Sequence, residues 1–387
     1  MNYKILANKW RPQEFNSVIG QKYIISAICN GLKLKRIHHT WLFHGIRGTG
    51  KTTIARLLAK SLSCEQKITQ NPCRKCSNCK EIEKGKFIDL FEVDAASHTK
   101  VEDMKELLEN VYYLPIKGRF KIYLIDEVHM LSKNSFNALL KIIEEPPNHI
   151  KFILATTNLE KVPKTILSRC LNFQLRPISF TKIIKKIEHI LSQEHIFFEY
   201  EAIKLLSIES EGSLRDTLNL IEQAISIGNG KILTKIVQNM LGKLDNTTIL
   251  NIILALLKKD FKKMFLLFQY IQKLDINWEN ILTEILKLLY QIAMIQTFPT
   301  INKDYLFFEN QEINKKIYEI SKISKFSDIQ LYYKTILTGK KELCVAPSFR
   351  IGVEMTLLRA LNLNIKSITT NIDDIKDTKI KLCKIKK

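Results

Sequence analysis

The residues best suited to chemistry occupy a glycine-rich segment near the N-terminus. Residues 45–52 fit the spacing G-x-x-x-x-G-K-[ST], with an apolar run before them and a helix-forming run after them. A turn of this kind lets backbone N–H groups converge on phosphate oxygens, and the helix that it opens adds the positive end of its dipole. The pattern therefore predicts a nucleoside triphosphate site. The residues expected to bind the nucleotide there are Gly45, Gly48, Thr49, Gly50, Lys51, Thr52 and Thr53.

Two side chains of this segment have specific expected roles. Lys51 is expected to reach the β- and γ-phosphates, and Thr52 is expected to bind Mg²⁺. A glycine turn that only joins a strand to a helix is the alternative, and it leaves the Lys-Thr pair and the flanking pattern unexplained.

A pair of acids provides the second half of the expected site. Residues 121–127 form an apolar run that ends in Asp126 and Glu127. Asp126 is expected to hold Mg²⁺ through its water shell, and Glu127 to orient and deprotonate the attacking water. Alone, an acidic pair after a strand is usually a helix cap. Together with the glycine-rich segment, it favours a catalytic role.

Four of the eight cysteines cluster with the spacing C-x8-C-x2-C-x2-C. Disulfides are not expected in a reducing compartment, and four thiolates at short spacing suit a tetrahedral structural Zn²⁺. A redox switch and an iron–sulfur cluster remain alternatives. The expected metal ligands are Cys64, Cys73, Cys76 and Cys79.

Composition limits the class of protein and its partners. The 387 residues suffice for two or three domains, and the net charge of +21 is compatible with a nucleic-acid partner. Lysine is frequent throughout the chain, so the charge only supports this expectation. No apolar stretch approaches the roughly 18 residues of a membrane span, and the N-terminus lacks the apolar core of a signal peptide. We expect a cytoplasmic protein without membrane contact.

Apolar runs and helical periodicity predict an α/β part followed by all-α parts. Five short apolar runs separated by helical patterns predict a parallel sheet covered on both faces within residues 1–178, with the cysteine module 64–79 inserted after the first helix of the site. Helical spacing alone continues through two further domains, 179–242 and 243–366, before a basic tail, 367–387. The expected strands are 39–44, 88–93, 121–126, 151–156 and 171–175.

Several motifs resemble one family. A sheet domain with this phosphate loop, followed by helical domains, resembles the AAA+ ATPases. Residues 135–141, 144–147, 155–157 and 168–170 resemble clamp-loader ATPases. With the four-cysteine insert and residues 212–216 and 352–361, the chain resembles the gamma/tau family of bacterial DNA polymerase III over about residues 1–365.

The resemblance implies a fold, an activity and partners. It implies an AAA+ P-loop domain with a zinc insert, a helical lid, and a C-terminal helical collar. It also implies an ATPase within a hetero-pentamer made of copies of this chain with delta and delta-prime subunits. Such a loader uses ATP to open the ring-shaped β sliding clamp and place it on primed DNA.

The resemblance also implies roles for single residues. Arg11 and Ile19 lie in segments that resemble the lining of the adenine pocket. Thr157, with its neighbour Thr156 as the alternative, corresponds to a polar sensor near the γ-phosphate. Arg215 corresponds to an arginine of the lid that contacts the γ-phosphate of the same subunit. Arg169 corresponds to an arginine finger that reaches the ATP of a neighbouring subunit.

DNA contact is expected through the backbone of primer–template DNA. Residues 99–102 fit a helix capping box, and helix starts of this kind track the duplex in the family's loaders. Lys100 and Lys105 add charge, although exposed lysines on a solvated helix are the common case. Such contact weakens with salt.

Two other functions, a AAA+ motor on DNA junctions and a non-catalytic ATP-binding scaffold, remain alternatives. A motor is expected to carry a further DNA-reading domain after the lid, and the helical pattern beyond residue 242 does not indicate one. A scaffold is expected to lose residues of the phosphate loop or the acidic pair. The family's longer tau form carries C-terminal extensions, so this chain resembles the short gamma form.

Overall fold

The computed structural model describes residues 5–97, 110–242, 244–274, 276–298 and 311–363, with the side chains of 311–313 excepted. The chain divides into two compact units, Met1–Val237 and Gln238–Lys387, which are described separately. The capping box 99–102, Lys100, Lys105 and the tail 367–387 lie outside the described residues.

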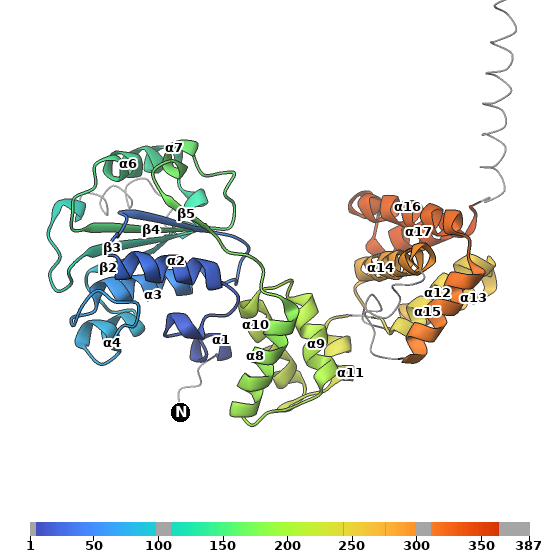
Figure 1. Ribbon diagram of the computed structural model, residues 1–387. Helices are drawn as coiled ribbons and strands as arrows, with labels where there is room; N and C mark the ends of the chain where they lie inside the picture. Colours follow the sequence, from blue (N-terminus) through green and yellow to red (C-terminus); the bar gives the residue numbers. More distant parts are fainter. Residues whose placement is uncertain (1–4, 98–109, 243, 275, 299–310, 364–387) are drawn as a thin grey trace, which may run out of the picture. The chain divides into compact units, whose positions relative to one another are not determined.

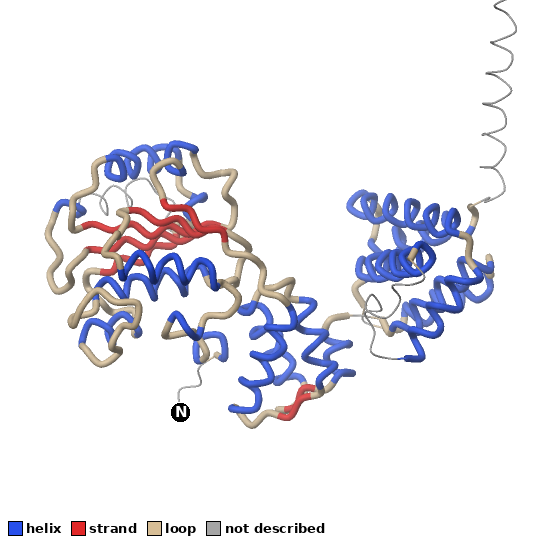
Figure 2. Tube along the Cα trace, viewed as in Figure 1, coloured by secondary structure: helices blue, strands red, loops and turns tan. Residues whose placement is uncertain are grey.

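A five-stranded parallel sheet forms the centre of the first unit, with strand order β2-β3-β4-β1-β5 (Figures 1 and 2). All five expected strands are present, with bounds that differ from the prediction by two residues or fewer. Parallel neighbours require crossover connections, which the intervening helices supply. The strands are β1 (Thr40–His44), β2 (Leu90–Asp94), β3 (Lys121–Asp126), β4 (Ile150–Thr156) and β5 (Leu171–Gln174).

Helices cover both faces of this sheet because the central strands are apolar on both sides. Along β3, Ile122 and Leu124 pack with α2 (Lys22–Lys33) and α3 (Lys51–Ser63), whereas Tyr123 and Ile125 pack with α6 (Lys133–Glu144) and α7 (Lys164–Leu167). Figure 1 shows these two pairs of helices on opposite faces. The α/β class is confirmed.

The cysteine module follows α3, as expected, and includes the short helix α4 (Ser77–Glu83). An ion pair joins it to α3. Lys60 of α3 is 2% exposed and forms an ion pair with Glu83, and Arg74 also pairs with Glu83. The module is therefore attached to the helix that begins at the phosphate loop.

A group of helices completes the first unit, and the N-terminal helix packs on it. The Trp10 indole N–H donates to Glu194 at 2.7 Å, and the backbone N–H of Leu6 donates to Glu222 at 3.3 Å. These elements are α1 (Leu6–Lys9), α8 (Phe180–Gln193), α9 (Tyr200–Glu209), α10 (Leu214–Ile227) and α11 (Thr234–Met240), which extends past the boundary of the unit.

One feature of this region differs from the prediction of helices alone. Phe197–Phe198 (β6) and Lys231–Ile232 (β7) form a two-stranded parallel sheet, seen as a short red segment in Figure 2. Strands of two residues are too short to produce an alternating pattern in the sequence, so periodicity does not detect them.

The second unit is helical where the structure describes it. Helix α14 is its centre and contacts α12, α15, α16 and α17, burying Leu282, Ile285 and Ile292 completely. No helix among the described residues is both long and apolar enough to cross a membrane. The helices are α12 (Asn246–Lys258), α13 (Phe261–Gln272), α14 (Trp278–Thr297), α15 (Gln311–Ile323), α16 (Phe326–Glu342) and α17 (Phe349–Leu361).

Candidate functional site

Three glycines give the loop between β1 and α3 its shape. Gly45, Gly48 and Gly50 have φ values of 146°, 74° and 103°, which side chains of L-residues disfavour. A Cβ atom on Gly45 would lie 2.3 Å from the carbonyl oxygen of Leu175, and one on Gly48 would lie 1.8 Å from Oγ of Ser213. Gly50 directly precedes α3 as its N-cap. Glycine is therefore required at 45 and 48 for both backbone and packing reasons.

Lys51 and Thr52 lie in the first turn of α3. The Lys51 ammonium donates hydrogen bonds to the carbonyl oxygens of Gly45 and Ile46, at 2.8 and 2.9 Å. The Thr52 hydroxyl donates to Oδ2 of Asp126 at 2.7 Å. The fold thus brings the hydroxyl of the loop and the carboxylate at the end of β3 into direct contact.

Opposing influences act on the charge of Lys51. Burial lowers the pKa of this side chain, which is 6% exposed, while the carboxylates of Glu127 and Asp126 raise it and Arg47 lowers it. A triphosphate beside this ammonium would favour its charged form, because a nearby anion stabilises the cation.

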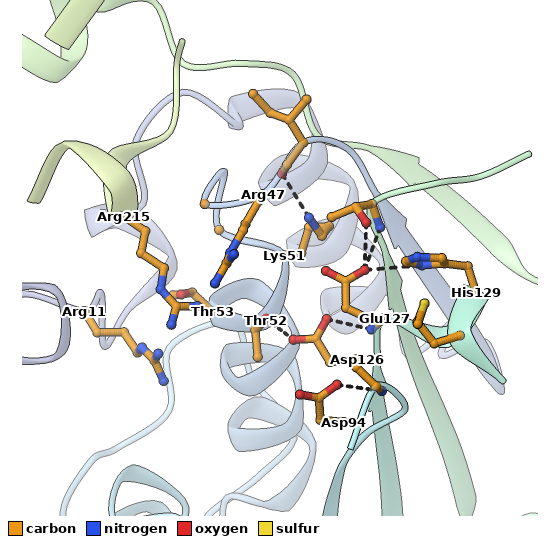
Figure 3. A pocket seen from close by; sticks show the side chains of 16 residues that line it. Arg11, Arg47, Lys51, Thr52, Thr53, Asp94, Asp126, Glu127, His129 and Arg215 are labelled. Atoms are coloured by element: carbon orange, nitrogen blue, oxygen red, sulfur yellow. Dashed lines mark hydrogen bonds and ion pairs between the residues drawn. The ribbon is translucent and has the colours of Figure 1, made fainter. Parts of the chain in front are cut away.

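A third acid accompanies Asp126 and Glu127. Asp94 ends β2 and lies directly opposite Asp126 in the register of the two strands. Asp94 lines the same cavity as the other two acids (Figure 3). Asp94 was not among the predicted site residues, although an acid at the end of a predicted parallel strand is a usable signal.

Glu127 occupies a left-handed backbone conformation, with φ of 49°, directly after β3. Its Oε2 atom accepts hydrogen bonds from the backbone N–H and the hydroxyl of Thr157, at 3.0 and 2.8 Å. The Nδ1 atom of His129 lies 3.3 Å from the same oxygen. Of the two adjacent threonines, Thr157 lines the cavity, whereas Thr156 is completely buried.

These groups surround a cavity of about 820 Å³ in the first unit (Figure 3). A narrower apolar recess of about 90 Å³ adjoins it and includes Ile19 and Thr49. The residues that line both are Arg11, Gly48, Gly50, Thr53 and Arg215.

Three arginines line this cavity together with Lys51 and the three acids. Arg11, Arg47 and Arg215 line it, and Arg47 was not among the predicted residues. Burial lowers the pKa of Arg11, and Arg56 and Arg215 act in the same direction. Arg215 lies in the first turn of α10, where the Ser213 hydroxyl accepts from the backbone N–H of Asp216 at 3.2 Å and caps the helix. Such a cavity suits a polyanionic ligand.

Arg169 does not line this cavity. Its guanidinium lies 2.9 Å from Oε1 of Glu144 and donates to the carbonyl oxygen of Thr165 at 3.0 Å, with 40% of its side chain exposed. The structure therefore places Arg169 outside the group that Lys51, Asp126 and Glu127 form.

The four predicted cysteines meet at one place. Their Sγ atoms all lie within 4.8 Å of one another, and Cys64 and Cys79 are completely buried. The backbone N–H groups of Cys76 and Lys75 lower the pKa of Cys73 to about 6, while burial raises the pKa of Cys79. Four thiolates about 2.3 Å from a tetrahedral zinc ion are separated by about 3.8 Å, so this cluster fits zinc after small shifts.

The fold and the site define a class of protein. A parallel sheet with a phosphate loop after β1, acids after β3 and an adjoining group of helices is the arrangement of a P-loop ATPase of the AAA+ class.

Comparison with protein families agrees with this class and narrows it. The family "DNA polymerase III, delta subunit" matches residues 20–179. "DNA polymerase III clamp loader subunit, ATPase lid domain" matches residues 182–230, and "DNA polymerase III subunits gamma and tau domain III" matches residues 232–376.

Individual relatives are similar over nearly the whole chain. The DNA polymerase III subunit gamma of Buchnera aphidicola subsp. Baizongia pistaciae is 62% identical over 95% of this chain and 99% of that protein. The subunit tau of Escherichia coli is 52% identical over 93% of this chain and 56% of that protein.

A solved structure of the Thermotoga maritima RuvB Holliday junction branch migration motor is 20% identical, with a TM-score of 0.44, over 64% of this chain and 79% of that one.

The chain belongs to the gamma/tau subunit family of DNA polymerase III, the ATPases of the clamp loader. The predicted family and enzyme class are confirmed.

Proposed function

We propose that this chain hydrolyses ATP to open the β sliding clamp and load it onto primed DNA, in the cytoplasm, within a hetero-pentamer. The other subunits are further copies of this chain, delta and delta-prime. The observation that carries the proposal is the convergence of Lys51, Thr52, Asp126 and Glu127 on one cavity in a member of the gamma/tau family.

The phosphate loop and the acids have separate tasks in this proposal. Gly45, Gly48 and Gly50 let backbone N–H groups approach the phosphates, and Lys51 binds the β- and γ-phosphates. Thr52 and Asp126 offer the hard oxygen donors that Mg²⁺ prefers. When bound, Mg²⁺ neutralises charge on the transferred phosphoryl group.

Glu127 is the general base for the attacking water. Its side chain lines the cavity with Lys51 and lies at hydrogen-bond distance from Thr157. Thr157, directly after β4, holds this carboxylate through two hydrogen bonds and serves as the sensor of the γ-phosphate.

The recess beside the phosphate loop receives the adenine base. Ile19 and Leu218 give it apolar walls, and Arg11 lies between it and the larger cavity. Apolar walls suit a planar base. Thr49 and Thr53 also line the recess and bind the nucleotide between its base and its phosphates.

Two arginines link hydrolysis to conformation and assembly. Arg215, in the first turn of α10, contacts the γ-phosphate of its own subunit and so couples the nucleotide to the position of the lid. Arg169 lies outside its own cavity and is exposed, so it is available to the ATP of a neighbouring subunit. Turnover then requires a correctly closed assembly.

Cys64, Cys73, Cys76 and Cys79 bind a structural zinc ion. The four sulfur atoms would occupy every position of a tetrahedral site, which would leave none for a substrate. The ion stabilises the module that Lys60 and Glu83 attach to α3.

Steady-state ATP hydrolysis by the assembled complex tests the proposal. The chain is combined with delta and delta-prime, with and without the β clamp and primed DNA. Joint stimulation by clamp and DNA is expected, and Lys51→Ala abolishes it while Lys33→Ala, an exposed lysine of α2, does not. Turnover that is indifferent to the clamp would contradict clamp loading, and absent turnover would contradict a catalytic role.

A further inference from the structure

His129 is a largely buried residue of the cavity to which the proposed function assigns no role. It lies in the short 3₁₀ turn Val128–Met130, directly after Glu127, and only 11% of its side chain is exposed. It lines the same cavity as Lys51 and Glu127, and Figure 3 shows it beside the Glu127 carboxylate.

Two acceptor atoms lie close to its Nδ1 atom. Oγ1 of Thr156, the last residue of β4, is 3.0 Å away, and Oε2 of Glu127 is 3.3 Å away. His129 therefore bridges the turn after β3 and the end of the neighbouring strand.

The hydrogen bonds of Thr156 determine where the imidazole proton lies. Its hydroxyl donates to the carbonyl oxygen of Asn158 at 3.0 Å and accepts from the backbone N–H of Asn158 at 3.1 Å. A hydroxyl has a single hydrogen, so Thr156 accepts from His129. A lone pair on Nδ1 would also face an ionised carboxylate oxygen at 3.3 Å, which is repulsive. Nδ1 therefore carries a hydrogen.

This arrangement treats the two oxygens of Glu127 differently. Oε2 accepts hydrogen bonds from the backbone N–H and the hydroxyl of Thr157, and Nδ1 of His129, which is hydrogen-bonded to Thr156, lies 3.3 Å from it. Among the described residues no hydrogen bond to Oε1 is found. Two hydrogen bonds and a neighbouring imidazole nitrogen at Oε2 leave Oε1 as the better proton acceptor, since an oxygen that accepts several hydrogen bonds is less basic.

We propose that His129 is a positioning residue: its Nδ1–H donates to Thr156 and lies beside Oε2 of Glu127, where it stabilises negative charge, so that Oε1 accepts the proton of the attacking water. As that proton moves to Oε1, the water oxygen bonds to the γ-phosphorus, and the bond from phosphorus to the β,γ-bridging oxygen breaks with its electron pair leaving on ADP. This inference rests on the proposed role of Glu127.

Three substitutions separate positioning from a purely structural role. His129→Asn places an amide N–H where Nδ1 lies, because both nitrogens are bonded to Cγ. His129→Gln places its amide one bond further out, and His129→Leu keeps the volume without a donor. Each variant is assembled with delta and delta-prime and assayed with clamp and primed DNA.

The expected result is a loss in kcat with little change in ATP binding. His129→Leu is expected to lower kcat roughly 10- to 100-fold, a part of the 10²- to 10⁴-fold that a general base supplies. His129→Asn is expected to recover most of that loss, and His129→Gln much less. The affinity of each variant for ATP is expected to stay within about twofold of the wild-type value, because other residues bind the nucleotide in the ground state. Equal losses in the Asn and Leu variants, or a loss in affinity that matches the loss in kcat, would overturn the proposal.

Glu127→Gln distinguishes this inference from the function on which it rests. If Glu127→Gln lowers turnover about 10²- to 10⁴-fold and His129→Leu leaves kcat unchanged, only the role of His129 is wrong. If Glu127→Gln keeps full turnover, the role of Glu127 itself is wrong. In the double variant, His129→Leu is expected to cause no further loss, since residues that act as a unit are not additive. Additive losses would show that His129 acts independently of Glu127 and would overturn the proposal.

Discussion

The hydroxyl of Thr52 donates a hydrogen bond of 2.7 Å to Oδ2 of Asp126, although 74 positions separate the two residues in the chain. Thr52 lies in the first turn of α3 and Asp126 is the last residue of β3. Parallel strands end at the same edge of a sheet, so the loop after β1 and the acid after β3 meet there. Two oxygen donors are thereby in place for one cation.

Removing the hydroxyl alone tests this pair. Thr52→Val keeps the shape of the side chain, and we expect turnover to fall roughly 10- to 100-fold because one hydrogen bond to a charged group is lost. Part of the loss should be recovered at high Mg²⁺. Thr181→Val, an exposed threonine of α8, is the matched control. A titration of turnover against Mg²⁺ that coincides with that of the control would exclude Thr52 as a ligand.

Gly48 offers a test of the loop's packing. Gly48→Ala is expected to be costly for two reasons, the φ of 74° and the distance of only 1.8 Å that would separate the added Cβ atom from Oγ of Ser213. Gly85→Ala, at φ of 68° with open space around it, isolates the backbone cost of about 1–2 kcal/mol. We expect Gly48→Ala to destabilise the chain more than Gly85→Ala and to weaken ATP binding, which Gly85→Ala leaves unchanged. Equal effects in thermal unfolding and nucleotide titration would contradict this.

The sequence predicts this loop well because its signal is local. Glycine spacing, an apolar strand before it and a helix after it lie within a few turns of chain, and near-continuous apolar runs likewise predict all five strands. Contacts between distant segments are harder to predict. Asp94 enters the cavity because the register of β2 and β3 places it opposite Asp126, and Arg47 enters it because of the shape of the loop, which glycine spacing alone does not specify. The β6–β7 pair is too short for periodicity, and the roles of His129 and Thr156 depend on atomic distances.

Removing zinc should loosen the module that packs on α3. Cys76→Ser is expected to lose bound zinc in metal analysis and to lower Tm by about 5–10 °C, as for a loss of 2–3 kcal/mol in a domain of this size. Cys344→Ser, an exposed cysteine outside the cluster, is the control. Because Glu83 pairs with Lys60 of α3, a modest loss of ATP affinity should accompany the loss of zinc. A zinc-free wild-type protein that keeps its Tm would rule out a structural ion.

Lys151 predicts a dependence of stability on pH. This lysine of β4 is 3% exposed, lies 3.3 Å from Nδ1 of His39, and has a pKa that burial lowers to about 8. The unfolded chain has a lysine pKa of about 10.4, so between pH 8 and 10.4 the unfolded state binds more protons and the contribution of Lys151 to stability rises with pH. Below pH 8 the ammonium is charged in both states, and its burial cost is fully present.

Replacing Lys151 should remove both the burial cost of its ammonium and the rise in stability above pH 8. Lys151→Met is expected to stabilise the protein at pH 7 by about 1–3 kcal/mol and to flatten the rise above pH 8. Lys161→Met, an exposed lysine in the turn after β4, should leave both unchanged. Denaturant unfolding between pH 7 and 10 measures the difference, and a rise that is unchanged in the variant would show that Lys151 is not the group that titrates.

Arg169 makes turnover depend on assembly of the complex. Arg169 pairs with Glu144 at 2.9 Å and lies outside its own cavity, so Arg169→Ala should leave the variant's ATP affinity unchanged. Turnover of the assembled complex should fall about 10³- to 10⁵-fold, the usual worth of an arginine finger. Mixing Arg169→Ala with Lys51→Ala chains should restore part of it, because the Lys51→Ala chain still supplies Arg169 to the intact site of its neighbour. Mixed complexes that stay inactive, although gel filtration shows normal assembly, would place the finger elsewhere.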